Sequence, residues 1–337
     1  MIRSVIKSGG FALVLVLWVL SLLTIMAGSF ALSMRREAAI VTGGSSNAKA
    51  KAVAESGLAV AELMLMHPDQ RQRWRADGSI YQIDYTESKV RVQLLSEAGK
   101  VDINSADQVL LQGLMLHAPV EEKLQTKLVN AILDWRDADD LVRIDGAEKE
   151  EYKEAGLSYR PRNKPFQSIE ELQLVLGMNE QVFNWLENLV TVYSGRPTVD
   201  LTQASKEVLQ VLPGMDAELI DGYIAARRES AINGLPVPAF GASAGTGDQP
   251  VAPTNSPETA VNNGAEQKGA MTVVTEALLD DGTAAMIRAL IKRSDSAGSS
   301  PFQALKWQRS IAVDASLFTD EKDQLLVRQY AEPEFNN

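Results

Sequence analysis

The most constraining feature of the sequence is a run of 22 residues without a charge, FALVLVLWVLSLLTIMAGSFAL, from Phe11 to Leu32. A helix of about 20 apolar residues crosses the hydrocarbon core of a bilayer. We therefore predict a transmembrane helix over residues 11–32. A cleaved secretory signal is the alternative, because Ala27, Gly28 and Ala31 are small. Its apolar region would usually be only ~7–15 residues long.

The rest of the chain is acidic and lacks the side chains of common catalytic sites. Beyond residue 32 there are 31 basic and 44 acidic residues, a net charge of −13, which disfavours binding to phosphate backbones. The absence of cysteine excludes thiol nucleophiles and Cys-ligated zinc. The only histidines, His67 and His117, have no companion at ligand spacing. A His-based triad or a multi-His metal centre therefore has almost no material in this chain.

A short basic leader, MIRSVIKSGG, precedes the apolar run and ends in Gly10 directly before Phe11. This junction resembles the type III signal of type IV pilins and pseudopilins, which prepilin peptidase cuts. The resemblance implies cleavage between Gly10 and Phe11, with Phe11 as the N-methylated mature terminus. It also implies an inner-membrane protein with its bulk in the periplasm. Charge alone does not orient the helix, because Arg35 and Arg36 follow it.

The fifth residue after the expected cleavage is Leu15, where most pilin-like subunits carry a glutamate. A carboxylate in hydrocarbon costs several kcal/mol unless a cation pairs with it. Lack of this glutamate is a mark of the K-type pseudopilins. Leu15 is also simply a better residue for a membrane helix, so by itself it does not decide the family.

The first part of the body has the pattern of a pilin-like α+β domain. Residues 47–66 have apolar residues at steps of three and four, which predicts that the membrane helix extends, after a kink at Gly43-Gly44, into an amphipathic one. Two strands follow, at 80–85 and 89–94; in the second, Val90, Val92 and Leu94 alternate with polar residues. The alternation predicts a sheet with one buried face.

Two later segments repeat one another: VDINSADQVLLQGL from Val101 and VDLTQASKEVLQVLPGM from Val199. Each places polar N-cap residues before leucines at helical spacing. Both resemble helix-hairpin-helix units, with residues 166–178 closing the first copy. DNA-binding versions hold phosphate on a glycine-rich turn. Here Asp216 replaces the second glycine, so we expect a protein scaffold without nucleic acid.

The end of the chain contains a linker and further strands. Residues 241–270 are mostly small and polar, which predicts disorder. The Gly241–Gly245 match to a hydrolase motif lies in this linker and is therefore not expected to be catalytic. Strands at 272–279 and 284–293 flank a hairpin turn, although the second also fits a helix. A third strand is predicted at 302–309.

An unusual density of carboxylates lies in residues 134–151, which include DWRDADD and DGAEKEE. Carboxylates this close repel one another unless they are solvated or bridged, and calcium takes 6–8 oxygen ligands. The segment is not an EF-hand, because Leu141 and Val142 fall where that loop needs an oxygen ligand and a glycine. From the residues alone, both a solvated acidic loop and a cation site remain open.

WRDAD at 135–139, GAE at 146–148, Tyr159 and Asn163 resemble the signature of general secretion pathway protein K, the K-type minor pseudopilin of type II secretion. The resemblance implies a structural calcium. The implied ligands are Asp137, Asp139, Asp140 and Glu148.

The resemblance implies an α+β fold in which a large all-α, SAM-like domain interrupts a pilin-like antiparallel sheet. It implies a non-enzymatic role at the pseudopilus tip, with I- and J-type minor pseudopilins and other pseudopilins as partners. A type IV minor pilin and a membrane-tethered DNA receptor are the alternatives. The expected segments are a leader (1–10), the transmembrane helix (11–32), a helix with the first strands (33–100), the insertion (101–232, divided into 101–194 and 195–232), a disordered linker (233–270), closing strands (271–310) and an acidic tail (311–337).

Overall fold

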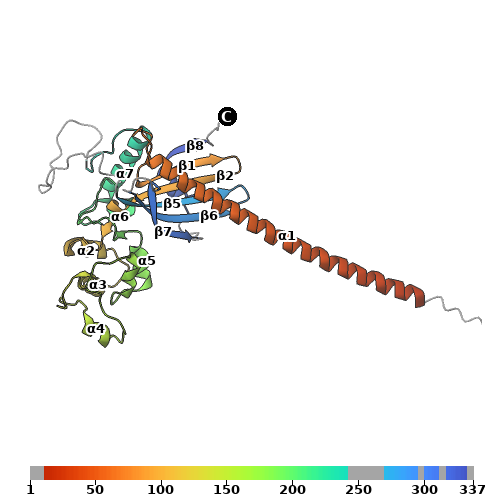
Figure 1. Cartoon of the computed structure of the whole chain (residues 1–337), viewed down its shortest axis with the longest axis horizontal. Coiled ribbons are helices and arrows are strands. Elements are labelled where there is room, and N and C mark those ends of the chain that lie inside the picture. Colours follow the sequence, from red (N-terminus) through yellow and green to blue (C-terminus); the bar gives the residue numbers. More distant parts are fainter. Residues whose placement is uncertain (1–10, 242–268, 295–299, 311–315, 332–337) are drawn as a thin grey trace, which may run out of the picture.

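The computed structural model describes residues 11–241, 269–294, 300–310 and 316–331. Its first element, α1, is one unbroken helix over Phe11–Leu65, about 80 Å long at 1.5 Å per residue. The helix continues without interruption through Gly43-Gly44, where a kink is predicted. Its N-terminal half extends away from the rest of the molecule (Figure 1) and is apolar enough to cross a membrane.

A six-stranded sheet has the order β7-β6-β5-β2-β1-β8. All neighbouring strands run antiparallel except β1 and β8, which are parallel. The predicted α+β class and every predicted strand are confirmed, including the second strand of the β5–β6 hairpin. The strands are β1 (Asp77–Tyr85), β2 (Ser88–Ser96), β5 (Ala270–Leu279), β6 (Ala284–Arg293), β7 (Phe302–Ser310) and β8 (Leu326–Ala331).

The C-terminal half of α1 packs across this sheet through small residues. Ala50, Ala54, Gly57 and Ala61 recur at steps of three and four, which places them on one side of the helix, and all are buried. A Cβ added at Gly57 would lie only 2.7 Å from Cγ1 of Val90 in β2. The helix axis can therefore approach the sheet closely only with residues of this size.

The helical insertion begins and ends at neighbouring strands. β2 and β5 pair from Ser88↔Leu279 to Ser96↔Met271, so the chain leaves the sheet and re-enters it at adjacent positions. The elements between them are η1 (Glu97–Gly99), β3 (Val101–Asp102), α2 (Gln108–Met115), α3 (Glu122–Arg136), α4 (Lys149–Glu154), η2 (Ile169–Leu174), α5 (Glu180–Leu186), β4 (Val190–Thr191), α6 (Lys206–Val211) and α7 (Ala217–Ile232).

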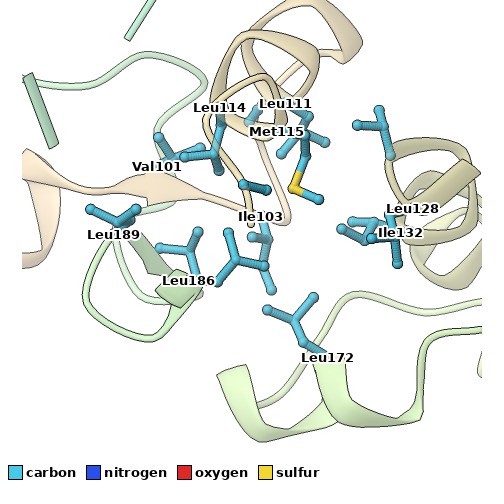
Figure 2. Packing of buried hydrophobic residues seen from close by; sticks show 14 of the residues in the cluster. Val101, Ile103, Leu111, Leu114, Met115, Leu128, Ile132, Leu172, Leu186 and Leu189 are labelled. Atoms are coloured by element: carbon cyan, nitrogen blue, oxygen red, sulfur yellow. The ribbon is translucent and has the colours of Figure 1, made fainter. Parts of the chain in front are cut away.

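One hydrophobic core runs through the whole insertion. Figure 2 shows Met115 of α2 pointing toward Leu128 and Ile132 of α3, with Leu114 beside Val101. The same buried cluster extends to residues of α6 and α7. A Cβ at Gly113 would lie 3.0 Å from Pro213, in the turn of the second hairpin. The two predicted subdomains, 101–194 and 195–232, therefore share one core.

The internal repeat is preserved in the structure. Asp107 and Ser205 occupy equivalent positions and cap α2 and α6. In each copy an arginine of the second helix donates to carbonyl groups in the loop before the first helix. Arg136 contacts the carbonyls of Ile103 and Ala106, and Arg227 contacts those of Thr202 and Ala204. In each copy, these hydrogen bonds join the second helix to the loop before the first helix.

The segment expected to be an acidic tail adds to the sheet instead. Within residues 316–331 lie α8 (Asp320–Asp323) and β8, which pairs with β1 at the edge. Leu317 is buried, and its carbonyl accepts a 2.7 Å hydrogen bond from Arg91 of β2. Arg91 and Gln93 are buried as well, so the central strand β2 is covered on both faces, which differs from the single buried face predicted.

The expected linker begins later than residue 233. The ring of Phe240 lies 4.9 Å, edge-on, from that of Tyr223 in α7, and Leu235 donates its amide to the carbonyl of Ser230. Residues 233–241 are thus packed on α7. Residues 242–268, for which disorder is predicted, lie outside the described residues.

Candidate metal centre and hairpin turns

The processing site lies at the very start of the described chain. Phe11 is the first residue of α1, and Gly10 lies outside the described residues. Leu15 is on the exposed apolar part of the helix, with 53% of its surface accessible. Cleavage and methylation at the Gly10–Phe11 bond stay predictions.

The acidic segment is a loop between α3 and α4, anchored by Asp134 in the last turn of α3. The Asp134 side chain is fully buried, and its Oδ2 accepts a 2.9 Å hydrogen bond from the amide of Ala147. A Cβ on Gly146 would collide with the same oxygen. Glycine is therefore required at position 146 for the loop to close over Asp134.

Arg143 is the cation that compensates this buried charge. Its Nη1 lies 2.7 Å from Oδ1 of Asp134 and also contacts Oδ2 of Asp137. Both carboxylates raise the pKa of Arg143 by accepting its hydrogen bonds. The sequence prediction overlooked Asp134 and Arg143, although one arginine within a run of acids is itself a signal of an internal ion pair.

Of the four predicted ligands, Asp137 and Glu148 carry buried oxygens that have no hydrogen-bond donor. These are Oδ1 of Asp137 and both carboxylate oxygens of Glu148. Oδ1 of Asn163 is also buried and unpaired, while its Nδ2 donates to Oδ1 of Asp140 at 2.9 Å and to the carbonyl of Asp139. Asn163 adopts φ = 51°, a left-handed conformation that Asn tolerates.

The surroundings of Glu148 disfavour the charged form of its carboxyl group. Burial first, and then the nearby carboxylates of Asp134, Asp137, Asp140 and Asp139, together raise its pKa to about 7. An ionised carboxylate that is buried without a donor needs a proton or a cation. Glu148 is therefore the residue at which a bound cation would have the largest effect.

By donor type this loop fits calcium, which binds carboxylate and amide oxygens. Asp137, Glu148 and Asn163 would supply unpaired oxygens, and Asp139 and Asp140 exposed ones. In the described part of the chain, no three His, Cys, Asp or Glu residues are close enough together to hold a metal. Arg143 partly explains this, because its guanidinium already bridges two of the carboxylates.

Within the WRDAD motif, the first two residues have structural roles. The ring of Trp135 is buried 6.0 Å from that of Phe166 and 6.1 Å from that of Tyr152. Arg136 closes the first hairpin through backbone carbonyls. Of the aspartates in the motif, Asp137 has a buried unpaired Oδ1, and Oδ1 of Asp139 accepts a hydrogen bond from the amide of Leu141.

The second hairpin turn carries its own anion at the start of α7. Gly214 has φ = 76°, and α7 begins directly after Asp216. Oδ1 of Asp216 accepts hydrogen bonds from the amides of Glu218 at 2.9 Å and Leu219 at 3.2 Å. The aspartate thus occupies donors that a phosphate would use.

Comparison with known proteins gives one family match. Residues 89–195 match the family described as "Type II secretion system (T2SS), protein K". The matched region runs from β2 through the first hairpin and the acidic loop to the end of β4. No curated protein matches the chain significantly.

Among solved structures, the chain is similar to one in the crystal structure of the GspK-GspI-GspJ complex from the enterotoxigenic Escherichia coli type 2 secretion system. The sequence identity is 19%, the TM-score is 0.45, and the similarity covers 78% of this chain and 95% of that chain. The resemblance to type II secretion system protein K, predicted from the acidic motif and the leader, is confirmed by the family match over residues 89–195.

Proposed function

We propose that the chain is a non-enzymatic minor pseudopilin at the tip of the type II secretion pseudopilus. There it starts assembly and supports the export of folded proteins across the outer membrane. The observation that carries the proposal is the protein K match over residues 89–195, in a chain that opens with the long apolar helix α1. We propose inner-membrane anchoring by residues 11–32, with the sheet and the insertion in the periplasm.

Two features favour a terminal position over one within the fibre. A subunit inside a fibre gains from a membrane-embedded glutamate that meets the terminal amine of a neighbour, whereas Leu15 has no charge to pair. The insertion also projects to the side of α1 (Figure 1), which widens the head beyond the sheet. Stacking such heads along a narrow fibre would create overlap, and a cap avoids it.

The partners that the resemblance implies are I- and J-type minor pseudopilins, with other pseudopilins below them and prepilin peptidase as the processing enzyme. Coexpression of the full chain with the I- and J-type proteins, followed by affinity capture, should recover all three. Deletion of the chain should abolish secretion, and the intact chain should restore it. Normal secretion in the deletion strain would refute the proposal.

Immunogold labelling separates a tip subunit from a minor pilin scattered along a type IV pilus. Label confined to fibre ends is expected for a cap, and label along the shaft would sink the tip position. A DNA receptor is not favoured, because Asp216 already holds the turn amides.

We propose in addition that calcium binds the loop between α3 and α4 as a structural ion. The unpaired buried oxygens of Asp137, Glu148 and Asn163 support it. Excess calcium should raise the melting temperature of the full chain in detergent relative to chelator. Asp137→Asn should reduce this increase, whereas Asp280→Asn in the β5–β6 turn should preserve it. Equal melting temperatures in calcium and in chelator would show that the acidic loop is only solvated and binds no calcium.

A further inference from the structure

We propose that the loop between α3 and α4 is a protein-docking surface, formed by the exposed apolar side chains of Leu141, Val142 and Ile144. The occupant is another protein of the secretion machinery that offers an apolar hollow with a basic rim. This inference rests on the proposed function, and it adds a contact between this loop and a partner protein.

The three side chains are unusually exposed for apolar residues. Leu141 is 77% exposed, Val142 49% and Ile144 89%, and Ile144 is the most exposed large hydrophobic residue in the described part of the chain. Isolated apolar residues on a surface are ordinary. Three within four positions form a local apolar patch, a feature that marks interaction sites.

The loop holds these side chains outward through contacts of its own backbone. Arg143, between them, turns inward to the buried Asp134. Nδ2 of Asn130 in α3 donates a 2.8 Å hydrogen bond to the carbonyl of Ile144, and the amide of Leu141 donates to Oδ1 of Asp139 at 2.9 Å. A surface that is already ordered loses less entropy on binding. The exposed residues are therefore already ordered before a partner binds.

Charge identifies the class of partner. Residues 137–154 contain eight acidic and three basic side chains, a net charge of −5. Such a loop repels anionic lipid headgroups, which argues against insertion into a membrane. A second copy of the chain would bring another acidic body, and the linker 242–268 contains three acids and one lysine. A protein with lysine or arginine around an apolar hollow complements the loop best.

The position of the loop also separates this contact from packing along α1. In Figure 1, α3 and α4 lie at the end of the insertion that is farthest from the sheet and from the projecting helix. A partner bound there would approach from the side of the fibre. It would not compete with subunits that associate through their membrane helices.

A double substitution, Leu141→Ser with Ile144→Ser, tests the surface in the full chain in secreting cells. Because both side chains are mostly exposed, the melting temperature and cellular level should stay unchanged, while secretion should fall at least tenfold. The matched control is Val109→Ser with Leu219→Ser, which replaces residues that are 68% and 58% exposed on α2 and α7. The control should secrete normally.

The outcomes distinguish this inference from the proposed function. If deletion of the chain abolishes secretion but the double variant secretes like the wild type, the docking surface is refuted and the tip role survives. If deletion leaves secretion intact, the proposed function fails and this inference fails with it. An equal fall in the control variant would also refute a specific role for the loop.

A photo-reactive amino acid at position 144 provides a second readout that does not depend on secretion. We expect a cross-link to a protein component of the machinery. Asp145→Asn should reduce its yield several-fold, since asparagine tolerates the φ of 60° at this position but removes the charge. A cross-link only to lipid or to another copy of the chain, no cross-link, or a yield insensitive to Asp145 would overturn the proposal.

Discussion

Glu148 gives the sharpest test of whether the acidic loop is built around a cation. Its side chain is buried, neither of its oxygens has a hydrogen-bond donor, and burial together with the neighbouring carboxylates raises its pKa from 4.5 to about 7. We expect Glu148→Gln to relieve this penalty, because the amide has nearly the same shape and no charge. In the absence of calcium the variant should therefore be more stable than the wild type at alkaline pH.

The sign and the size follow from proton linkage. The unfolded chain loses the Glu148 proton near pH 4.5, whereas the folded chain keeps it until about pH 7. Between these values the folded state binds more protons, so the stability of the wild type falls as pH rises. At about 1.4 kcal/mol per pKa unit, the difference between 4.5 and about 7 makes the full loss above pH 7 at most about 3.5 kcal/mol. Below pH 4.5 the two proteins should be equal.

Urea unfolding of the full chain in detergent, at pH 4.5 and pH 8, measures this difference. Calcium at about 1,000 times Kd should then reverse the order at pH 8, because an ionised Glu148 binds the ion and stabilises the wild type by RT ln(1 + [L]/Kd), about 4.1 kcal/mol, which exceeds the loss. Glu150→Gln, at an exposed position, is the control and should behave like the wild type. If Glu148→Gln matches the wild type at pH 8 in chelator, the burial argument is wrong.

Three further substitutions test the packing, each by urea unfolding. Gly57→Val should cost about 1–3 kcal/mol through overpacking against β2, whereas Gly44→Ala, in open space on the same helix, should be neutral or stabilising; equal effects would refute the close approach. Arg227→Met should cost about 3–5 kcal/mol, because it leaves the buried carboxylate of Asp77 without its cation. Arg228→Met, on the exposed side of α7, should cost about 1 kcal/mol or less. Gly146→Ala should cost about 1–3 kcal/mol, because its Cβ would meet a buried carboxylate; an unchanged midpoint would contradict this.

Features that depend on short-range patterns could be predicted from the sequence. The β5–β6 hairpin followed from two apolar runs around Asp281-Gly282, and Gly282 indeed has φ = 84°. The repeat at Val101 and Val199 followed from its polar N-cap residues. In each case the residues that form the element carry the signal within a few positions.

Features that depend on distant contacts could not be predicted in this way. The strand β8 was expected to be part of a tail, because the acidic residues around it outweigh its short apolar pattern and its partner β1 lies more than 200 residues earlier. The central strand β2 was expected to have one buried face. Arg91 is buried because Leu317 and Phe318 cover it from the C-terminal segment.

The candidate metal site shows the same limit. The sequence placed Asp137, Asp139, Asp140 and Glu148 in one loop, but it did not show which carboxylate would be buried. Only the fold reveals that Arg143 pairs with Asp134 and Asp137, while Glu148 is buried without a donor. The spacing of residues in the sequence alone does not show which of several neighbouring acids will form the ion pairs with a single arginine.

The way the insertion is fastened decides whether it can act as part of a cap. A large domain joined by one flexible connection would move independently and could turn out of the way of a neighbour. Here the insertion continues directly from β2 through η1, and near its other end the buried Arg227 of α7 donates to the carbonyl of Asp77 at the start of β1. An ion pair between Glu170 of η2 and Lys306 of β7 forms a second contact between the insertion and the sheet. These contacts hold the insertion to the sheet, on which the C-terminal half of α1 packs, so the insertion adds a fixed width to the sheet domain.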